Sequence, residues 1–267
     1  MSETDFAGAI PENYDRHLGP LIFASMASTM AARVGACHPS RVLETAAGTG
    51  IVTRALRDAL PGSTELIATD LQDGMLAVAR TKFKQGEQVT FQSADATALP
   101  FDNASFDALV CQFGIMFYAD LLAGAREIRR VLVPSGRAFV SIWDNHGHNP
   151  FGRLAFETVA SFFPVNPPNF HQVPFATPAK RVGEAFAAAG LVDITFTTVR
   201  HERPLPNLAS LACGMIEGTP VAEQVRARGG DPDAVTAALT SAYAASFGPA
   251  PTTMPIQAIF VEARAPN

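Results

Sequence analysis

The sequence predicts an α/β fold with a doubly wound, mostly parallel seven-stranded sheet, and three observations indicate it. Strand-like apolar runs alternate with helix-like patterns from residue 41 to about residue 145. The runs are apolar on both faces, which is typical of parallel strands covered by helices. Turns with glycine or acidic residues follow the runs, where open α/β sheets bind ligands. The chain of 267 residues is long enough for one such domain with embellishments.

The first forty residues predict a helical N-terminal cap over residues 1–40. Apolar side chains recur there at helical spacing, with small residues between them: Leu18, Leu21, Ile22, Met26 and Met30. We expect this cap to pack over a ligand-binding domain that covers residues 41–267.

From residue 41 onward, the pattern predicts strands and helices in alternation. The expected strands cover residues 42–43, 64–69, 89–93, 106–111, 137–143, 192–200 and 256–264. The expected helices cover residues 52–60, 74–83, 121–132 and 177–190. In the last of these, Thr177 is the expected N-cap and Pro178 the first-turn proline. Two segments interrupt the alternation, at about 145–176 and 201–255, and we expect both to be insertions that border the ligand pocket.

The composition excludes several classes of protein. The formal net charge of −5 argues against a nucleic-acid partner, because that binding depends on clustered Lys and Arg. No apolar run approaches the roughly 20 residues of a membrane span. The acidic N-terminus lacks the basic start and apolar core of a signal peptide, so we expect a cytoplasmic protein. The oligomeric state is left open, with a homodimer as one candidate.

The cysteines and the one basic cluster carry no functional signal. The cysteines are widely separated and show no metal-ligand spacing, so we expect no metal site. They are Cys37, Cys111 and Cys213. Arg126, Arg129 and Arg130 lie on the polar side of a predicted helix, and we interpret them as a solvated helix face.

The most informative motif is the turn that follows the first predicted strand. Small residues at Ala46, Gly48 and Gly50 allow a ligand to approach the backbone. A dinucleotide site would carry G-x-G-x-x-G, which is absent here. Glu44, two residues ahead of Ala46, would repel a pyrophosphate but suits a ligand with an ammonium or sulfonium charge. This motif therefore favours S-adenosylmethionine over NAD.

Similar markers follow four successive predicted strands. The first is the turn that begins at Glu44, and the second is Asp70. The third is Asp95-Ala96, and the fourth is Gln112-Phe113. Together they resemble the class I S-adenosylmethionine-dependent methyltransferases, especially the small-molecule enzymes similar to the ubiquinone and menaquinone biosynthesis methyltransferases. The resemblance covers residues 40 to 145 well, and residues 177–200 and 256–264 by strand pattern only.

The resemblance implies a role for each marker. The turn from Glu44 to Gly50 would lie against the methionine part of the cofactor, and Asp70 would accept hydrogen bonds from both ribose hydroxyls. The remaining positions would contact the adenine, face the transfer centre or close over the cofactor; they are Leu71, Met75, Asp95 and Ala96 for the adenine, Gln112 and Phe113 for the transfer centre, and Tyr14 for the closure. Ala46 and Ser135 depart from the family, which has glycine at both places.

Each acidic marker also has a purely structural interpretation. Glu44 could cap the turn that follows it, and Asp70 could be the N-cap of the next helix. Asp95 could be a turn residue, and Tyr14 a packing residue of the cap. The placement of the markers at neighbouring strand ends favours the binding interpretation.

Methyl transfer from a sulfonium is an in-line displacement that depends on proximity and needs no protein nucleophile. A general base helps only where the acceptor must lose a proton. The candidates are the histidines of the first insertion, His146, His148 and His171, with Tyr14 of the cap as a further alternative, and we select His171 and His148. Residues 145–149 could equally be a solvated loop, and no third ligand accompanies His146 and His148 as a metal pair.

Phenylalanines crowd the same insertion and either line an acceptor pocket or form the core of the insertion. They are Phe151, Phe156, Phe162, Phe163, Phe170 and Phe175. We expect a small, mostly apolar acceptor, methylated on an unassigned O, N or C atom, with S-adenosylhomocysteine as product. The alternatives are an NAD(P)-dependent oxidoreductase and a catalytically silent methyltransferase-like binding protein.

Overall fold

The computed structural model describes residues 6 and 8–267, and it has one seven-stranded sheet in the order β3-β2-β1-β4-β5-β7-β6. The strands are β1 (Arg41–Glu44), β2 (Glu65–Asp70), β3 (Val89–Ser93), β4 (Phe106–Gln112), β5 (Leu132–Trp143), β6 (Val192–Leu205) and β7 (Thr252–Arg264). Strands β1 to β5 pair in parallel, whereas β7 is antiparallel to both β5 and β6. The predicted doubly wound, mostly parallel fold is confirmed.

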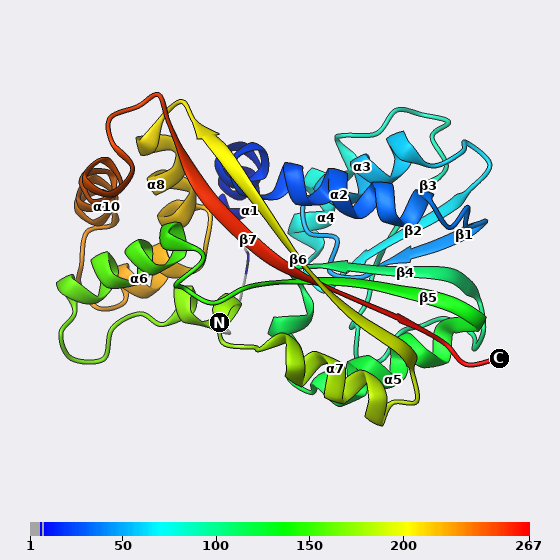
Figure 1. Ribbon diagram of the computed structural model, residues 1–267. Coiled ribbons are helices and arrows are strands. Elements are labelled where there is room, and N and C mark those ends of the chain that lie inside the picture. The colour runs from blue at the N-terminus through cyan, green and yellow to red at the C-terminus, as the bar shows by residue number, and fades with distance from the viewer. Residues whose placement is uncertain (1–5, 7) are drawn as a thin grey trace.

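Helices cover both faces of the sheet (Figure 1). One layer holds α2 (Ala24–Gly35), α3 (Ile51–Ala59) and α4 (Asp73–Arg80), and the other holds α5 (Leu121–Val131) and α7 (Ala179–Ala188). The strand order reverses at β1 and β4, which are neighbours in the sheet. A crevice forms at such a reversal, outside the carboxyl ends of the strands. The fold therefore places the segments after β1, β2 and β4 around one site.

The N-terminal segment is helical from Ile10 to Gly35 and contains an unusual middle part. A short helix α1 (Ile10–Asn13) leads into η1 (Tyr14–Phe23), a π-helix of 10 residues, and then into α2. Pro20 inside η1 donates no backbone hydrogen bond, and the Arg203 guanidinium donates to the carbonyl oxygens of Pro20 and Leu21 at 2.9 and 3.1 Å. The predicted cap includes residues 1–5 and 7, which lie outside the described residues. The acidic N-terminus, from which we expected a cytoplasmic protein, belongs to this part of the chain.

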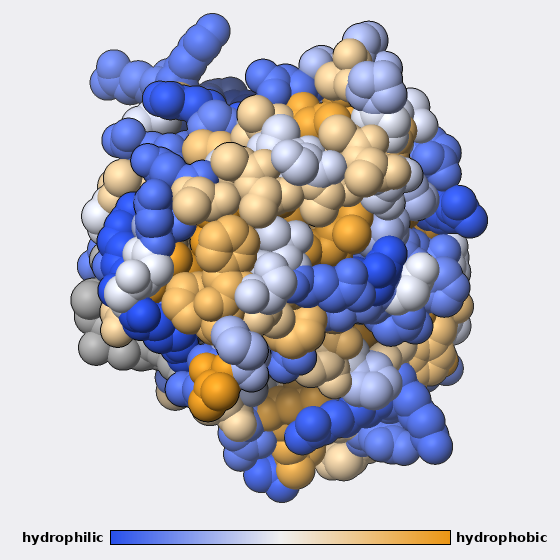
Figure 2. Space-filling view, turned by 90° about the vertical axis from the view of Figure 1, so that its left-hand side faces the viewer, coloured by the Kyte–Doolittle hydropathy of each residue, from blue (hydrophilic) through white to orange (hydrophobic). Residues whose placement is uncertain are grey.

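A second group of helices lies at the end of the molecule to which the β6–β7 ribbon extends (Figure 1). It comprises α6 (Pro150–Phe162), the 3₁₀ helix η3 (Phe170–Phe175), α8 (Leu208–Glu217), α9 (Val221–Arg226) and α10 (Pro232–Phe247). Figure 2 shows apolar surface in the middle of this end, framed by hydrophilic residues. Among residues 6 and 8–267, no helix combines the length and apolar character needed to cross a membrane.

The predicted insertion at 201–255 is too long at both ends. β6 continues to Leu205 and β7 begins at Thr252, and these two residues pair with each other, so the helical interruption covers residues 206–251. Residues 200–203 are charged or polar, so the sequence did not indicate that the strand continues through them. They fit in β6 because it is an edge strand whose side chains alternate between half-buried and exposed.

Two local predictions were also wrong. β5 begins at Leu132 rather than at residue 137. The early start was not predicted because residues 133–136 form an irregularity in the pairing with β4, between the pairs Phe106↔Leu132 and Ala108↔Arg137. Ser135 has a φ of 64° there, the conformation for which the family uses glycine. Thr177 does not cap α7, whose N-cap is Pro178 without a side-chain hydrogen bond.

Candidate active site

A cavity of about 380 Å³ lies at the carboxyl ends of the central strands, and it collects nearly all the predicted cofactor residues. The predicted residues in its wall are Tyr14, Glu44, Ala46, Gly48, Asp70, Leu71, Met75, Asp95, Ala96, Gln112 and Phe113. These residues come from the N-terminal segment, from the segments that end or follow β1, β2, β3 and β4, and, for Met75, from α4. The sequence markers therefore meet in one place.

The turn after β1 depends on left-handed backbone conformations. Gly48 and Gly50 have φ values of 56° and 77°, and Ala46 has a φ of 52°. Contrary to the prediction, Gly50 is not in the cavity wall: it begins α3, and a Cβ there would lie 2.8 Å from the Cβ of Ala79. Gly50 therefore lets α3 and α4 approach closely. The methyl group of Ala46 fits because Gly114 faces it without a side chain.

Asp70 holds the turn and also faces the cavity. Its Oδ2 accepts a hydrogen bond from the Gly48 amide at 2.8 Å, and its Oδ1 accepts one from the Gln72 amide at 2.9 Å. Burial raises the pKa of Asp70, although these backbone donors oppose the rise. The N-cap of α4 is Gln72, so the alternative that Asp70 is the N-cap is wrong.

Glu44 and Gln112 leave unpaired acceptor atoms in the cavity wall. Glu44 is 2% exposed, and burial raises the pKa of its carboxyl to about 8, although the neighbouring Thr53 opposes the rise. Within the described residues, Oε2 of Glu44 and Oε1 of Gln112 are buried and have no hydrogen-bond partner. Buried acceptors of this kind are satisfied by a ligand that donates hydrogen bonds or carries positive charge. The residues therefore fit the ammonium and sulfonium groups of S-adenosylmethionine.

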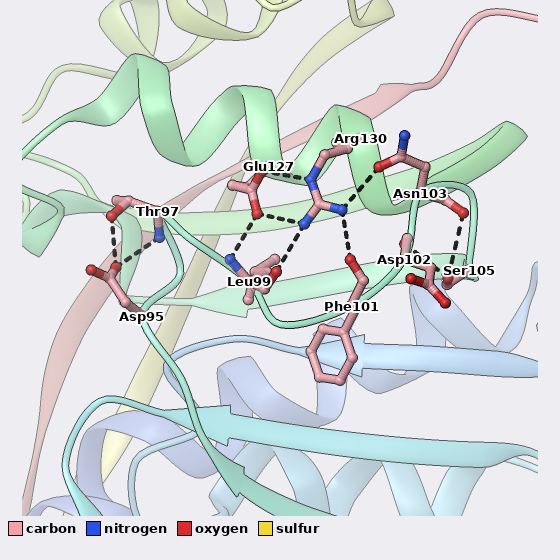
Figure 3. Close-up of polar contacts among 9 residues, drawn as sticks. All are labelled: Asp95, Thr97, Leu99, Phe101, Asp102, Asn103, Ser105, Glu127 and Arg130. Carbon is pink, nitrogen blue, oxygen red and sulfur yellow. Dashed lines mark hydrogen bonds and ion pairs between the residues drawn. The ribbon is translucent and has the colours of Figure 1, made fainter.

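The loop between β3 and β4 forms another part of the wall and is braced by α5 (Figure 3). Oδ1 of Asp95 accepts hydrogen bonds from the Thr97 amide and hydroxyl, at 2.8 and 2.7 Å. The Arg130 guanidinium donates to the carbonyl oxygen of Leu99 at 2.9 Å and to that of Phe101 at 2.6 Å. Glu127 pairs with Arg130 and also accepts the Leu99 amide at 2.7 Å. The interpretation of Arg130 as a solvated side chain was wrong.

An Arg130→Ala variant is expected to weaken binding of S-adenosylhomocysteine about tenfold, because the loop that carries Asp95 loses its bracing hydrogen bonds. Calorimetric titration measures the change. Arg126→Ala is the matched control, since Arg126 is exposed on the same helix. Equal affinities of the two variants would contradict a bracing role of Arg130.

A second, smaller cavity of about 60 Å³ adjoins the first, and its wall is mainly aromatic. Tyr14, Phe23 and Phe113 line both cavities. The rings of Phe113 and Trp143 stack at a centroid distance of 3.9 Å. Of the phenylalanines singled out from the sequence, those in its wall are Phe151, Phe170 and Phe175. We call this second cavity the aromatic chamber.

The two selected histidines lie in different surroundings. His171 is buried in the wall of the aromatic chamber, its Nε2 lies 2.9 Å from the Met215 carbonyl oxygen, and burial lowers its pKa to about 4. It is therefore neutral at neutral pH. The structure does not bring His148 to either cavity, since its side chain is 52% exposed and lies 3.1 Å from Asp144. His146 lies 3.1 Å from the carbonyl oxygen of His171 and lines neither cavity.

Sequence reasoning missed several aromatic wall residues, namely Phe6, Phe23, Phe117 and Tyr118. Tyr118 follows β4, and its hydroxyl lies 3.1 Å from Oγ1 of Thr45 at the start of the turn. The position of Phe117 and Tyr118 just after Gln112-Phe113 was a usable signal, because the segments after β1 and β4 meet at the strand reversal. Among residues 6 and 8–267, no cluster of three His, Cys, Asp or Glu side chains suits a metal ion.

Comparison with known proteins identifies the class of this fold. Residues 42–136 match the family model described as a methyltransferase domain. The YcgJ protein from Bacillus subtilis has a similar structure, with a TM-score of 0.59 and 20% identity over 91% of this chain and 99% of that one. The chain therefore contains a class I methyltransferase domain, of the S-adenosylmethionine-dependent class, and the resemblance predicted from the sequence is confirmed.

Two curated relatives extend the comparison. A demethylmenaquinone methyltransferase of Thermus thermophilus is 38% identical over 128 residues, which are 46% of this chain and 58% of that protein. An uncharacterised protein of Mycobacterium bovis is 31% identical over 185 residues, or 69% of this chain and 63% of that protein. The chain spans about half the length of the demethylmenaquinone methyltransferases that it matches.

Proposed function

We propose that this protein binds S-adenosylmethionine in the main cavity and transfers its methyl group to a small, mostly apolar acceptor in the aromatic chamber. The observation that carries the proposal is the pair of buried, unpaired acceptors, Glu44 Oε2 and Gln112 Oε1, in a wall that continues into that chamber. The matched methyltransferase domain supports the same assignment.

Each part of the cofactor has a group of residues to hold it. Glu44 and Gln112 would accept hydrogen bonds from the methionine end, and Asp70 from the ribose hydroxyls. The adenine would lie among the side chains and backbone of Leu71, Met75 and Ala96. The bound sulfonium supplies an electrophilic methyl group, so the protein contributes mainly position and exclusion of water.

The aromatic chamber favours an uncharged acceptor with a flat or aliphatic body. The side chains of its wall that carry polar atoms are those of Tyr14, Trp143, His171 and Thr219, and the rest of the wall is apolar. The name of the Thermus thermophilus relative, demethylmenaquinone methyltransferase, supports an aromatic ring as acceptor. His171, with a pKa lowered to about 4, suits a hydrogen-bonding role better than proton removal at neutral pH.

The competing functions fit the site less well. An NAD(P)-dependent oxidoreductase would place a pyrophosphate beside the turn and next to Glu44, whose carboxyl the negative charge would keep protonated, so that Glu44 offers the pyrophosphate no positive charge. A catalytically silent binding protein would keep the cavity and lack transfer, which an activity measurement decides. The cytoplasmic location, the homodimer and the lack of a nucleic-acid partner stay predictions.

The test has two stages. Calorimetry with S-adenosylmethionine, S-adenosylhomocysteine and NADH should show binding of the first two ligands alone. Transfer of a labelled methyl group is then measured over a panel of small phenols, reduced quinones and amines. Binding of NADH alone would refute the proposal, and cofactor binding without transfer across a broad metabolite pool would favour the silent binding protein.

A further inference from the structure

Lys82 lies just after α4, and its ammonium group joins the N-terminal segment to the turn after β1. Its Nζ donates a hydrogen bond to the carbonyl oxygen of Thr49 at 2.7 Å and pairs with the carboxylate of Asp15 in η1. The side chains of Lys82 and Asp15 are only 21% and 25% exposed. One cation therefore connects three segments that are distant in the sequence.

Both partners of Lys82 are next to residues of the cofactor site. Thr49 lies in the wall of the main cavity and follows Gly48, whose amide is bound by Asp70. Asp15 follows Tyr14, whose ring lines both the main cavity and the aromatic chamber. The Tyr14 ring stacks on Phe23 at a centroid distance of 4.9 Å. A displacement of Asp15 would therefore move the ring that lies between the two cavities.

Other contacts fix different parts of the π-helix. Nδ1 of His17 lies 2.9 Å from the hydroxyl of Ser210 in α8, and Arg203 holds the carbonyl oxygens of Pro20 and Leu21. Neither contact reaches the turn after β1. Within the described residues, the ion pair of Asp15 with Lys82 is the polar side-chain link between η1 and that turn.

The link is open to solvent on its outer side. A shallow groove of about 610 Å³ runs between α2 and α3, and both Asp15 and Lys82 line it. Ile51 lines both this groove and the main cavity, so the ion pair of Asp15 with Lys82 lies near the residue that separates solvent from the cofactor site. Salt therefore has direct access to the ion pair, which makes the link breakable.

We propose that Lys82 is a positioning residue that fastens the N-terminal segment onto the cofactor turn and so keeps Tyr14 over the bound cofactor. Release of the cofactor requires the pair between Lys82 and Asp15 to open. This inference rests on the proposed function, because it assigns the main cavity to S-adenosylmethionine. It concerns Asp15 and Lys82, which lie outside the cavity wall.

A Lys82→Met variant tests the inference, with Lys84→Met as the matched control because Lys84 is exposed two residues further on. We expect Lys82→Met to raise the Kd of S-adenosylhomocysteine about tenfold, as loss of a charge-assisted link implies. Most of the change should be in the dissociation rate, measured by stopped flow through the fluorescence of Trp143, the single tryptophan. Asp15→Asn should have a similar effect, and the double variant should add little. Lys82→Arg should restore binding in part.

The outcome separates failure of this inference from failure of the proposed function. If the unaltered protein binds neither S-adenosylmethionine nor S-adenosylhomocysteine, the proposed function fails. Amide hydrogen exchange then still tests the link, since Lys82→Met alone should speed exchange in residues 14–23. If the unaltered protein binds and Lys82→Met matches Lys84→Met in Kd, dissociation rate and exchange, the inference is overturned. A fall in melting temperature with an unchanged dissociation rate would also overturn it.

Discussion

An Asp70→Ala variant is expected to bind S-adenosylmethionine about 100-fold more weakly than the unaltered protein. In the proposed complex Asp70 accepts charge-assisted hydrogen bonds from the two ribose hydroxyls, and the variant would lose both, each of which contributes on the order of 1.5 kcal/mol. The substitution also frees the Gly48 amide, which Asp70 binds at 2.8 Å, and so loosens the turn. Calorimetric titration with S-adenosylmethionine and S-adenosylhomocysteine measures the loss.

The control for this variant is Asp73→Ala, since Asp73 is exposed in the first turn of α4, three residues further on. It should bind both ligands as the unaltered protein does. An Asp70→Ala protein that folds normally and keeps its affinity would remove Asp70 from the ribose site and leave it the structural role of holding Gly48.

The affinity for S-adenosylmethionine is expected to rise with pH, by up to about tenfold per unit between roughly pH 6 and pH 8. Without ligand, burial raises the pKa of Glu44 to about 8, so the carboxyl is mostly protonated at pH 6. A cationic ligand beside Glu44 favours the carboxylate, so binding releases a proton. Calorimetry in buffers of different ionisation enthalpy measures both the affinity and the released proton.

A Glu44→Gln variant should abolish this pH dependence and bind weakly at every pH, because it cannot become a carboxylate. A slope that persists in Glu44→Gln would assign the released proton to another group. A flat profile in the unaltered protein would show that Glu44 does not contact the cation.

The same titration affects the stability of the ligand-free protein, with a sign that follows from the direction of the shift. The pKa of Glu44 rises from 4.5 to about 8 on folding, so the folded state binds more protons than the unfolded state in that range. The stabilising contribution of Glu44 is therefore complete below pH 4.5, and it is lost as the pH rises through about 8. The melting temperature should therefore fall over this window, and less so in Glu44→Gln.

The central half of the fold was predictable because local pattern and burial agree there. β3 and β4 begin at the residues that the sequence indicated, and Glu44 and Asp70 each extend the predicted end of a strand by one residue. Strands buried on both faces give continuous apolar runs, which the sequence displays directly. The two charged residues stand out because they terminate such runs.

The rest depends on contacts between segments that are distant in the sequence. The Nε2 of the buried His171 lies 2.9 Å from the carbonyl oxygen of Met215, 44 residues away, and no local pattern reports that contact. Phe23 was not singled out from the sequence, and the packing of η1 brings it to the cavity. Gly50 was predicted to contact the ligand, but position 50 requires glycine because a Cβ there would collide with Ala79 in α4. Periodicity identifies what a strand or helix buries, but not its partner.

The methyl group of Ala46 occupies the volume that a side chain at position 114 would need, and the two positions differ in how far they tolerate a change. A Cβ on Gly114 would lie 2.4 Å from the methyl group of Ala46 and 2.9 Å from the sulfur of Cys111. Removing the methyl from Ala46 would clear only one of these obstacles, and glycine tolerates the φ of 52° at that position better than alanine does. Position 46 is therefore the adjustable member of the pair: its side chain can change the width of the main cavity beside the turn, whereas position 114 has to remain glycine.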